Sequence, residues 1–426
     1  MVCGVLCAAT QLLAPGAAAQ TLTTIHTFTG GPNDGANPAS PLLISASGRL
    51  YGVTWYGGLP NCFYACGTVF SLAPPSSPGG AWRESVYDFQ GVTSVEYPTG
   101  LTASGGILYG TSWEGGSFGY GTVFALTSVG HTITAQVLHS FADSPDGALP
   151  STGVVAGSVG PSGLPVLYGT TYYGGIEGGY SGCGTVFSLT PPPTPGAAWA
   201  ETILHSFGGD LEGGIDGCFP QDLAIDAAGV LYGVTFSAGE PDAGIVFSLS
   251  PPSSPGGSWT ETVLYNFSGR ADGSNPAHIA ISSSGRLYVT TVAGGKSGYG
   301  TIVALTPPAT AGGSWHVAHI HPFAGGPTDG AYPGAMVTRG GVLYGVTAGG
   351  GTDGGGVVYS LTPPSSPGGT WTERVLHSFP SGENAYPPTS LAVDSTGVLY
   401  GTTSPGNGPQ LAGCAGGCGT VFSLTP

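Results

Sequence analysis

The chain repeats one short sequence pattern seven times, and this repetition constrains its fold more than any other feature. A Leu-Tyr pair, followed by glycine in six of its seven copies, recurs every 56 to 64 residues. The tyrosines of these copies are Tyr51, Tyr109, Tyr168, Tyr232, Tyr288, Tyr344 and Tyr400. Because periods of this length are typical of propellers and solenoids, we expect one repeat domain over residues 20–426.

Each repeat contains four short segments with the composition of β-strands. They are an apolar stretch such as 391–393, the Leu-Tyr-Gly segment, a segment such as 419–424, and a longer segment such as 371–379. We name them strands a, b, c and d. They are rich in β-branched and aromatic residues, and the 79 glycines and 37 prolines of the chain supply the turns between them. Four strands per unit predict the blades of an all-β propeller.

The two ends of the chain complement each other. The seventh repeat stops after its strand c, and residues 23–28 match the pattern of the missing strand d. We therefore predict a seven-bladed propeller of four-stranded blades whose last blade is closed by the N-terminal strand. Such closure removes the edges that an open sheet would expose. A seven-unit solenoid is the rival fold, but a solenoid needs polar caps.

The first residues predict export from the cell. Residues 1–19 form a short apolar run that ends in three alanines, which is typical of a signal peptide with its cleavage site. No basic residue precedes Arg49, so we expect the true translation start to lie upstream. No other segment is apolar over 18 residues, so no membrane span is expected. The six cysteines after residue 19 suit an oxidising compartment.

A family resemblance follows from the recurring Leu-Tyr-Gly-x-Thr, Gly-Thr-Val-Phe-x-Leu-Thr-Pro and Val-Leu-His-Ser-Phe segments. In these segments the chain resembles the bacterial GloVer tandem-repeat proteins, also called choice-of-anchor tandem-repeat proteins. The resemblance covers residues 21–426. It implies a secreted or surface repeat protein, and it transfers no catalytic residue.

The charge of the chain is negative and unevenly placed. A net charge of −16 disfavours nucleic acid as a partner. Strands alternate in direction, so the d–a and b–c loops share one side of the ring, which we call the top face. These loops hold Asp34, Glu96, Glu114, Asp143, Asp146, Glu177, Asp210, Glu212, Asp216, Glu240, Asp242, Asp272, Asp329, Asp353 and Glu383. The top face is expected to attract cations or cationic partners, calcium included, unless these acids only shape turns and maintain solubility.

The cysteines also map to top loops. Cys183 and Cys218 lie in loops of neighbouring blades, which predicts a disulfide between them. The remaining four cysteines fall in the b–c loops of blades 1 and 7, which become neighbours when the ring closes. They allow local disulfides Cys62–Cys66 and Cys414–Cys418, a staple across the closure, or a zinc site. The predicted secretion favours disulfides.

One pair of ionisable residues departs from the repeat on the innermost strand. Asp222 and His278 occupy equivalent positions in blades 4 and 5, where the other blades carry uncharged residues. Such a pair could orient an imidazole for acid–base work or bind a cation; the alternative is hydrogen bonding to the top loops. The candidate ligand-binding residues are Asp210, Glu212, Asp216, Asp222, Glu240, Asp242 and His278.

Other recurring residues favour structural roles. Histidines recur in five strands d, at His26, His139, His205, His321 and His377. Strand d is the outermost strand, so these histidines cannot meet at one metal, and packing or hydrogen bonding is expected. Tryptophans recur at the start of strand d, at Trp82, Trp199, Trp259, Trp315 and Trp371, and are expected to pack between blades.

These observations favour a binding function over catalysis. We predict a secreted, monomeric propeller that binds an extracellular glycan or cation-bridged polymer at the acidic top face. The alternatives are an extracellular polysaccharide hydrolase or lyase and a purely structural envelope protein. No cofactor is evident, and the fold by itself does not fix the function.

Overall fold

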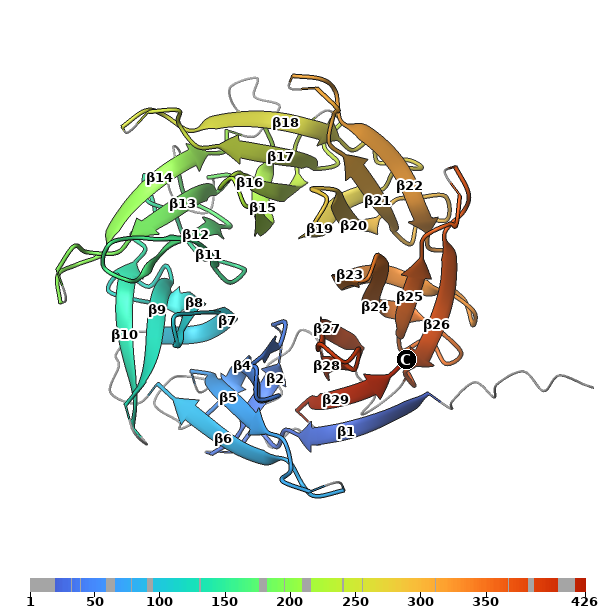
Figure 1. Ribbon diagram of the computed structural model, residues 1–426, viewed down its shortest axis with the longest axis horizontal. Coiled ribbons are helices and arrows are strands. Elements are labelled where there is room, and N and C mark those ends of the chain that lie inside the picture. The colour runs from blue at the N-terminus through green and yellow to red at the C-terminus, as the bar shows by residue number, and fades with distance from the viewer. Residues whose placement is uncertain are drawn as a thin grey trace, which may run out of the picture.

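Seven antiparallel sheets form a closed ring (Figure 1). The computed structural model describes residues 20–31, 33–38, 40–58, 66–77, 79–89, 95–129, 132–175, 182–194, 196–208, 216–239, 241–254, 256–310, 312–366, 368–381, 387–404 and 418–426. Every regular element in these residues is a strand. No helix in this part of the chain could cross a membrane. The protein is therefore a seven-bladed β-propeller.

Each blade is built from consecutive strands. Blade 1 holds β2 (Gly35–Pro38), β3 (Leu43–Ile44), β4 (Leu50–Gly57), β5 (Thr68–Ala73) and β6 (Arg83–Asp88). Blade 2 holds β7 (Val95–Ser104), β8 (Ile107–Gly115), β9 (Thr122–Val129) and β10 (Thr132–Ser140). Blade 3 holds β11 (Val155–Val159), β12 (Pro165–Thr171), β13 (Thr185–Thr190) and β14 (Ala200–Ser206).

The remaining blades follow the same plan. Blade 4 holds β15 (Cys218–Ile225), β16 (Leu231–Ser237), β17 (Ile245–Ser250) and β18 (Thr260–Asn266). Blade 5 holds β19 (Ser274–Ile281), β20 (Leu287–Ala293), β21 (Thr301–Thr306) and β22 (His316–Pro322). Blade 6 holds β23 (Gly330–Arg339), β24 (Val342–Gly350), β25 (Val357–Thr362) and β26 (Thr372–Ser378). Blade 7 holds β27 (Pro388–Val393), β28 (Leu399–Thr403), β29 (Thr420–Thr425) and β1 (Thr21–Thr27).

Strand a of blade 1 is split into two pieces, β2 and β3, which both pair with β4. Pro38 and Pro41 lie at and after the end of β2, and proline has no N–H to donate to a ladder. In every blade, strand a lies nearest the centre of the ring and strand d lies outermost (Figure 1).

The ring is closed by the first strand of the chain, as the sequence predicts. β1 pairs antiparallel with β29, from Thr21 opposite Thr425 to Thr27 opposite Thr420. Figure 1 shows β1 as the outer strand of blade 7, beside the C-terminal strand. The closing strand also joins two apolar clusters, because Phe28 is buried against blade 1 and Leu22 packs into the cluster shared by blades 6 and 7.

Side-chain packing explains the glycine of the Leu-Tyr-Gly motif. A Cβ on Gly52 would lie 2.5 Å from Phe70 Cζ, because this ring of strand c lies directly on the backbone of strand b. Five further blades repeat this close approach of a phenylalanine or tyrosine ring to glycine. Blade 5 has Val289 opposite Val303 instead, so the glycine is absent where the ring is absent.

Tryptophans join neighbouring blades, as expected. Trp199 at the start of β14 lies edge-on to Tyr109 of β8 in the preceding blade, with ring centroids 6.1 Å apart. The same contact joins Trp82–Tyr400, Trp259–Tyr168, Trp315–Tyr232 and Trp371–Tyr288. The core of the protein thus lies between blades, and each junction contributes its own apolar cluster.

Candidate functional site

The predicted disulfide between blades 3 and 4 is present. Cys183 and Cys218 are bonded, with their Cα atoms 4.5 Å apart, and tie the b–c loop of blade 3 to the start of β15. Cys66 and Cys418 each take part in a disulfide as well. Cys62 and Cys414, the other members of the two predicted local pairs, lie outside the described residues, so those pairings stay predictions.

The structure brings Asp222 and His278 together. His278 Nδ1 lies 3.5 Å from Asp222 Oδ2, and the two side chains are 32% and 28% exposed. Asp222 also accepts hydrogen bonds from the backbone N–H groups of Leu223 and Ile279, so it ties β15 to β19. The pair therefore joins the innermost strands of blades 4 and 5, with the imidazole held on its Nδ1 side.

The other predicted ligand-binding acids are placed differently. Asp216 accepts hydrogen bonds from the imidazole of His205 and the backbone N–H of Gly208. Asp242 accepts the N–H of Ala238 at 2.6 Å within its own loop. Both carboxylates thus bond to neighbouring parts of the chain. Asp210, Glu212 and Glu240 lie outside the described residues.

Half-buried aromatic rings form a continuous band over blades 1 to 4. Trp55 stacks on Trp113 with ring centroids 6.4 Å apart, Trp113 contacts Tyr172 at 5.8 Å, and Tyr172 stacks on Phe219 at 4.8 Å. Tyr97 adds a contact to Trp55 at 6.5 Å. We call these five residues the aromatic arc. Each of the first three links crosses a blade junction, and all five rings are partly accessible to solvent.

The arc lies at the top face. Trp55 and Trp113 stand at the top ends of β4 and β8, and Tyr172 directly follows β12. Tyr97 and Phe219 stand near the starts of β7 and β15, which follow d–a loops. Phe219 precedes Asp222 by three residues, so the arc ends on β15, the strand that carries Asp222.

Two rings of the arc sit on a strained backbone. Tyr97 and Phe219 have φ angles of 56° and 59°, in the left-handed region that costs an ordinary residue about 1–2 kcal/mol. The equivalent residues of four other blades share this conformation: Asn37, Leu149, Asn275 and Tyr332 have φ angles between 57° and 59°. The left-handed backbone therefore belongs to the repeat, and because asparagine tolerates it better, it does not by itself explain the aromatic residues.

Sequence reasoning missed the arc, although a signal was present. The third residue after each repeat tyrosine is a threonine or serine, and the residue that follows it varies along the chain. This variable position reads Trp55, Trp113, Tyr172, Phe236, Val292, Ala348 and Ser404. It is aromatic in the first four blades and small in the last three, which is a departure from structural repetition.

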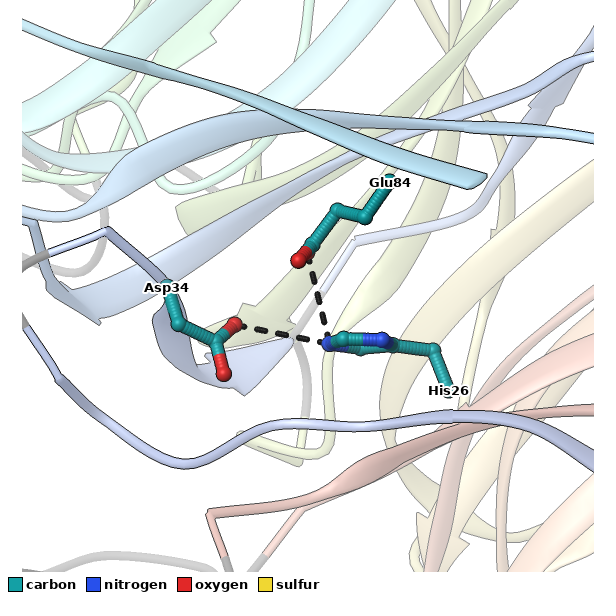
Figure 2. A group of neighbouring side chains, drawn as sticks. All are labelled: His26, Asp34 and Glu84. Atoms are coloured by element: carbon teal, nitrogen blue, oxygen red, sulfur yellow. Dashed lines mark hydrogen bonds and ion pairs between the residues drawn. The ribbon is translucent and has the colours of Figure 1, made fainter. Parts of the chain in front are cut away.

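A second kind of cluster lies at the blade junctions. Figure 2 shows His26 of β1 pointing toward Asp34, in the loop before β2, and Glu84 of β6. His26 Nε2 lies 3.4 Å from Asp34 Oδ1 and 3.3 Å from Glu84 Oε1. The same arrangement recurs with His321, Asp329 and Glu373.

Two further junctions hold the same residue types. His139 Nε2 contacts both oxygens of Asp146 at 3.1 Å, and His205 Nε2 lies 3.1 Å from Asp216. Glu201 and Glu261 lie within electrostatic reach of these two pairs. The histidines are hydrogen-bonded between blades, each at its own junction, as expected for structural residues.

The glutamates of these clusters have shifted pKa values. Burial raises the pKa of Glu84, Glu201 and Glu373 to about 7, and the nearby aspartates add to the shift. Burial acts upward on Asp34 as well, but hydrogen bonds from His26, Thr29 and Gly35 outweigh it and keep the pKa of Asp34 below its usual value. The clusters of His26 and His321 therefore each combine an aspartate of lowered pKa, Asp34 or Asp329, with a glutamate whose pKa is raised to about 7.

These clusters fit a shared proton better than a calcium ion. The His26–Asp34–Glu84 and His321–Asp329–Glu373 groups each bring one nitrogen and two carboxylate oxygens within 4.8 Å of one another. Calcium prefers an all-oxygen set, which this is not. Both oxygens of Asp34 already accept backbone or hydroxyl hydrogen bonds. The repetition at several junctions also indicates a clamp between blades.

A profile of the Gloeobacter/Verrucomicrobia repeat matches residues 12–178 and 219–426. The chain belongs to this repeat family. The match agrees with the resemblance drawn from the recurring segments. No curated protein sequence matches the chain.

The solved structures that are similar to this Gloeobacter/Verrucomicrobia repeat protein include the following two. One is a crystal structure from Bacteroides uniformis, assigned provisionally as a 6-phosphogluconolactonase, with 13% identity, a TM-score of 0.52, and coverage of 88% of this chain and 99% of that one. Another is the PQQ-bound aldose sugar dehydrogenase of Streptomyces coelicolor, with 15% identity, a TM-score of 0.46, and coverage of 80% and 97%. At these identities the likeness concerns the fold alone.

Proposed function

We propose that this protein is a secreted, monomeric glycan-binding propeller and that the aromatic arc is its binding platform. The observation that carries the proposal is the unbroken run of ring contacts from Trp55 to Phe219, which crosses three blade junctions on the top face. Partly exposed rings in a row offer a strip of apolar surface to successive sugar units of a polymer. The Cys183–Cys218 bridge beside the arc supports an extracellular setting.

The proposed ligand is a neutral polysaccharide. The chain carries a net charge of −16, and Glu96 and Glu114 face each other across β7 and β8 beside the arc. Burial, together with the charge of Glu96, raises the pKa of Glu114. An anionic polymer would be repelled by such acids, whereas the hydroxyl groups of neutral sugars can donate to them.

Binding can be measured with defined oligosaccharides. Cellohexaose, laminarihexaose, xylohexaose and mannohexaose are titrated by calorimetry and by tryptophan fluorescence. We expect saturable binding of at least one of them, and a loss of about tenfold in affinity in the W55A/W113A variant. The proposal fails if none of the four binds, or if the double variant binds as tightly as the wild type.

A matched control lies on the opposite side of the ring. Tyr299 and Tyr332 form an exposed ring pair between blades 5 and 6, outside the arc, with centroids 5.6 Å apart. The Y299A/Y332A variant removes two aromatic rings from the same face. It is expected to retain the wild-type affinity for the glycan.

A second candidate function is cleavage of the same glycan. The Asp222 carboxylate holds His278 through Nδ1, which leaves Nε2 available as a general base at the end of the arc. In that case the D222N and H278A variants would bind the oligosaccharide but release no shorter products. Absence of product from the wild-type protein with every oligosaccharide it binds would contradict this function and leave the binding function intact.

A further inference from the structure

The junction between blades 1 and 2 lacks three side chains that recur at the other junctions. At five junctions a tryptophan at the start of strand d lies against the repeat tyrosine of the preceding blade. In blade 2 the tryptophan position is occupied by Ile133, as the strand register shows. Thr134, the next residue, pairs with Thr127. In blade 5, His316 follows Trp315 and pairs with the equivalent residue Thr306. The tyrosine that would receive the indole is Tyr51 of blade 1.

The same junction also lacks the polar clamp. Tyr87 occupies the position that histidine holds in other blades, opposite Val69. Ala135 occupies the glutamate position, opposite Leu126. Tryptophan, histidine and glutamate are thus all replaced at this junction. The junction of blades 4 and 5 keeps Trp315, and that of blades 6 and 7 keeps His377.

A cavity lies where the missing indole would be. It has a volume of about 530 Å³, and Tyr51, Val69, Leu108 and Ile133 are among its lining residues. Ile133 is 43% exposed, because its side chain is too short to cover the space. Strands b and d meet here on the bottom face, so the cavity is separate from the aromatic arc. Its volume is within the range of small-molecule sites.

The wall of the cavity also carries a positive charge. Arg49 lines it, and its Nη1 donates to Ser71 Oγ at 3.1 Å. A guanidinium has five N–H donors, so others remain for a ligand. Within the described residues, no carboxylate forms an ion pair with Arg49. The hydroxyl groups of Ser85 and Ser128 also border the space.

We propose that this cavity binds a planar aromatic carboxylate of about the size of an indole acid. The ring would take the place that a tryptophan side chain holds at five other junctions, and it would lie against Tyr51. The carboxylate would meet the Arg49 guanidinium, whose planar set of N–H donors can bind both oxygens of a carboxylate. The inference does not depend on the proposed glycan-binding function, because the two sites lie on opposite faces of the ring.

Indole-3-acetate is the probe, with indole as the uncharged comparator. Titration calorimetry is expected to show one saturable site for indole-3-acetate in the wild type. The I133W variant gives this junction the residue that five others carry and is expected to weaken binding about tenfold or more. The R49Q variant is expected to weaken indole-3-acetate but to leave indole unchanged. Unchanged binding in I133W, or no saturable binding of either probe, would overturn the proposal.

Two further measurements test the proposal without the I133W variant, so they apply even if that variant does not fold. Wild-type crystals soaked in indole-3-acetate are expected to show the ring beside Tyr51, and density at any other place counts against the site. The W315I variant opens the equivalent space over Tyr232 between blades 4 and 5 and is expected to bind indole as a second site. Failure of W315I to gain indole binding would show that the vacated indole space does not make a ligand site.

Discussion

His26 Nε2 lies 3.3 Å from Glu84 Oε1 and so links the first strand of the chain, in blade 7, to the outermost strand of blade 1. Glu84 Oε1 is buried and forms no hydrogen bond within the described residues, as is also true of Glu201, Glu261 and Glu373 Oε1. A buried carboxylate oxygen that accepts no hydrogen bond is costly when the group is charged, and much less so when the carboxyl group is protonated. The raised pKa values of these glutamates follow from this position.

The glutamates make stability depend on pH. The pKa of Glu84, Glu201 and Glu373 is about 7 in the folded protein against an ordinary value of 4.5, so between these values the folded state binds more protons than the unfolded state. Their contribution is fully present below pH 4.5 and is lost as the pH rises through about 7. We expect thermal unfolding at a higher temperature at pH 5 than at pH 8.

The E84Q/E201Q/E373Q variant tests the cause, because glutamine keeps the shape and does not titrate. Its melting temperature is expected to change less between pH 5 and pH 8 than that of the wild type. D353N, which alters an exposed acid in a top loop, is the control and is expected to keep the wild-type dependence. An unchanged slope in the triple variant would show that other groups govern the pH response.

The repeated parts of the fold could be predicted from the sequence because all seven repeats encode the same four strands. Seven Leu-Tyr motifs fixed the number of blades, and the unpaired pattern at residues 23–28 identified the closing strand. The Cys183–Cys218 bridge followed from the loop map that this topology defines. Equivalent positions of the seven repeats could be compared with one another, as homologous sequences are compared in an alignment.

The candidate sites were harder to predict because they depend on contacts across junctions. Glu84 reaches His26 only because strand d of one blade ends beside the start of strand d of the next, and no sequence spacing shows this. The arc likewise joins Trp113 to Tyr172 across a junction. Asp222 and His278 were found because they are adjacent on inner strands and differ from the repeat in charge.

The closing strand should be essential for the ring. A chain that begins at residue 30 leaves β29 without its partner and removes Phe28 and Leu22 from two apolar clusters. We expect it to melt at a lower temperature than a chain that begins at residue 20 and to associate through the exposed edge, as light scattering would show. A peptide of residues 20–29 added in trans should restore the melting temperature. If the shortened chain stays monomeric and equally stable, β1 is not the closure that the fold requires.

The strained arc residues should separate stability from binding. Phe219 has a φ angle of 59°, which glycine adopts freely and alanine does not. Both F219A and F219G remove the ring that stacks on Tyr172, so both should lose glycan affinity to the same extent. Chemical denaturation should nevertheless find F219G more stable than F219A by roughly 1 kcal/mol, because only the alanine retains the left-handed strain. Equal stability of the two variants would show that the backbone relaxes once the ring is gone, and that the ring itself holds residue 219 in the strained conformation.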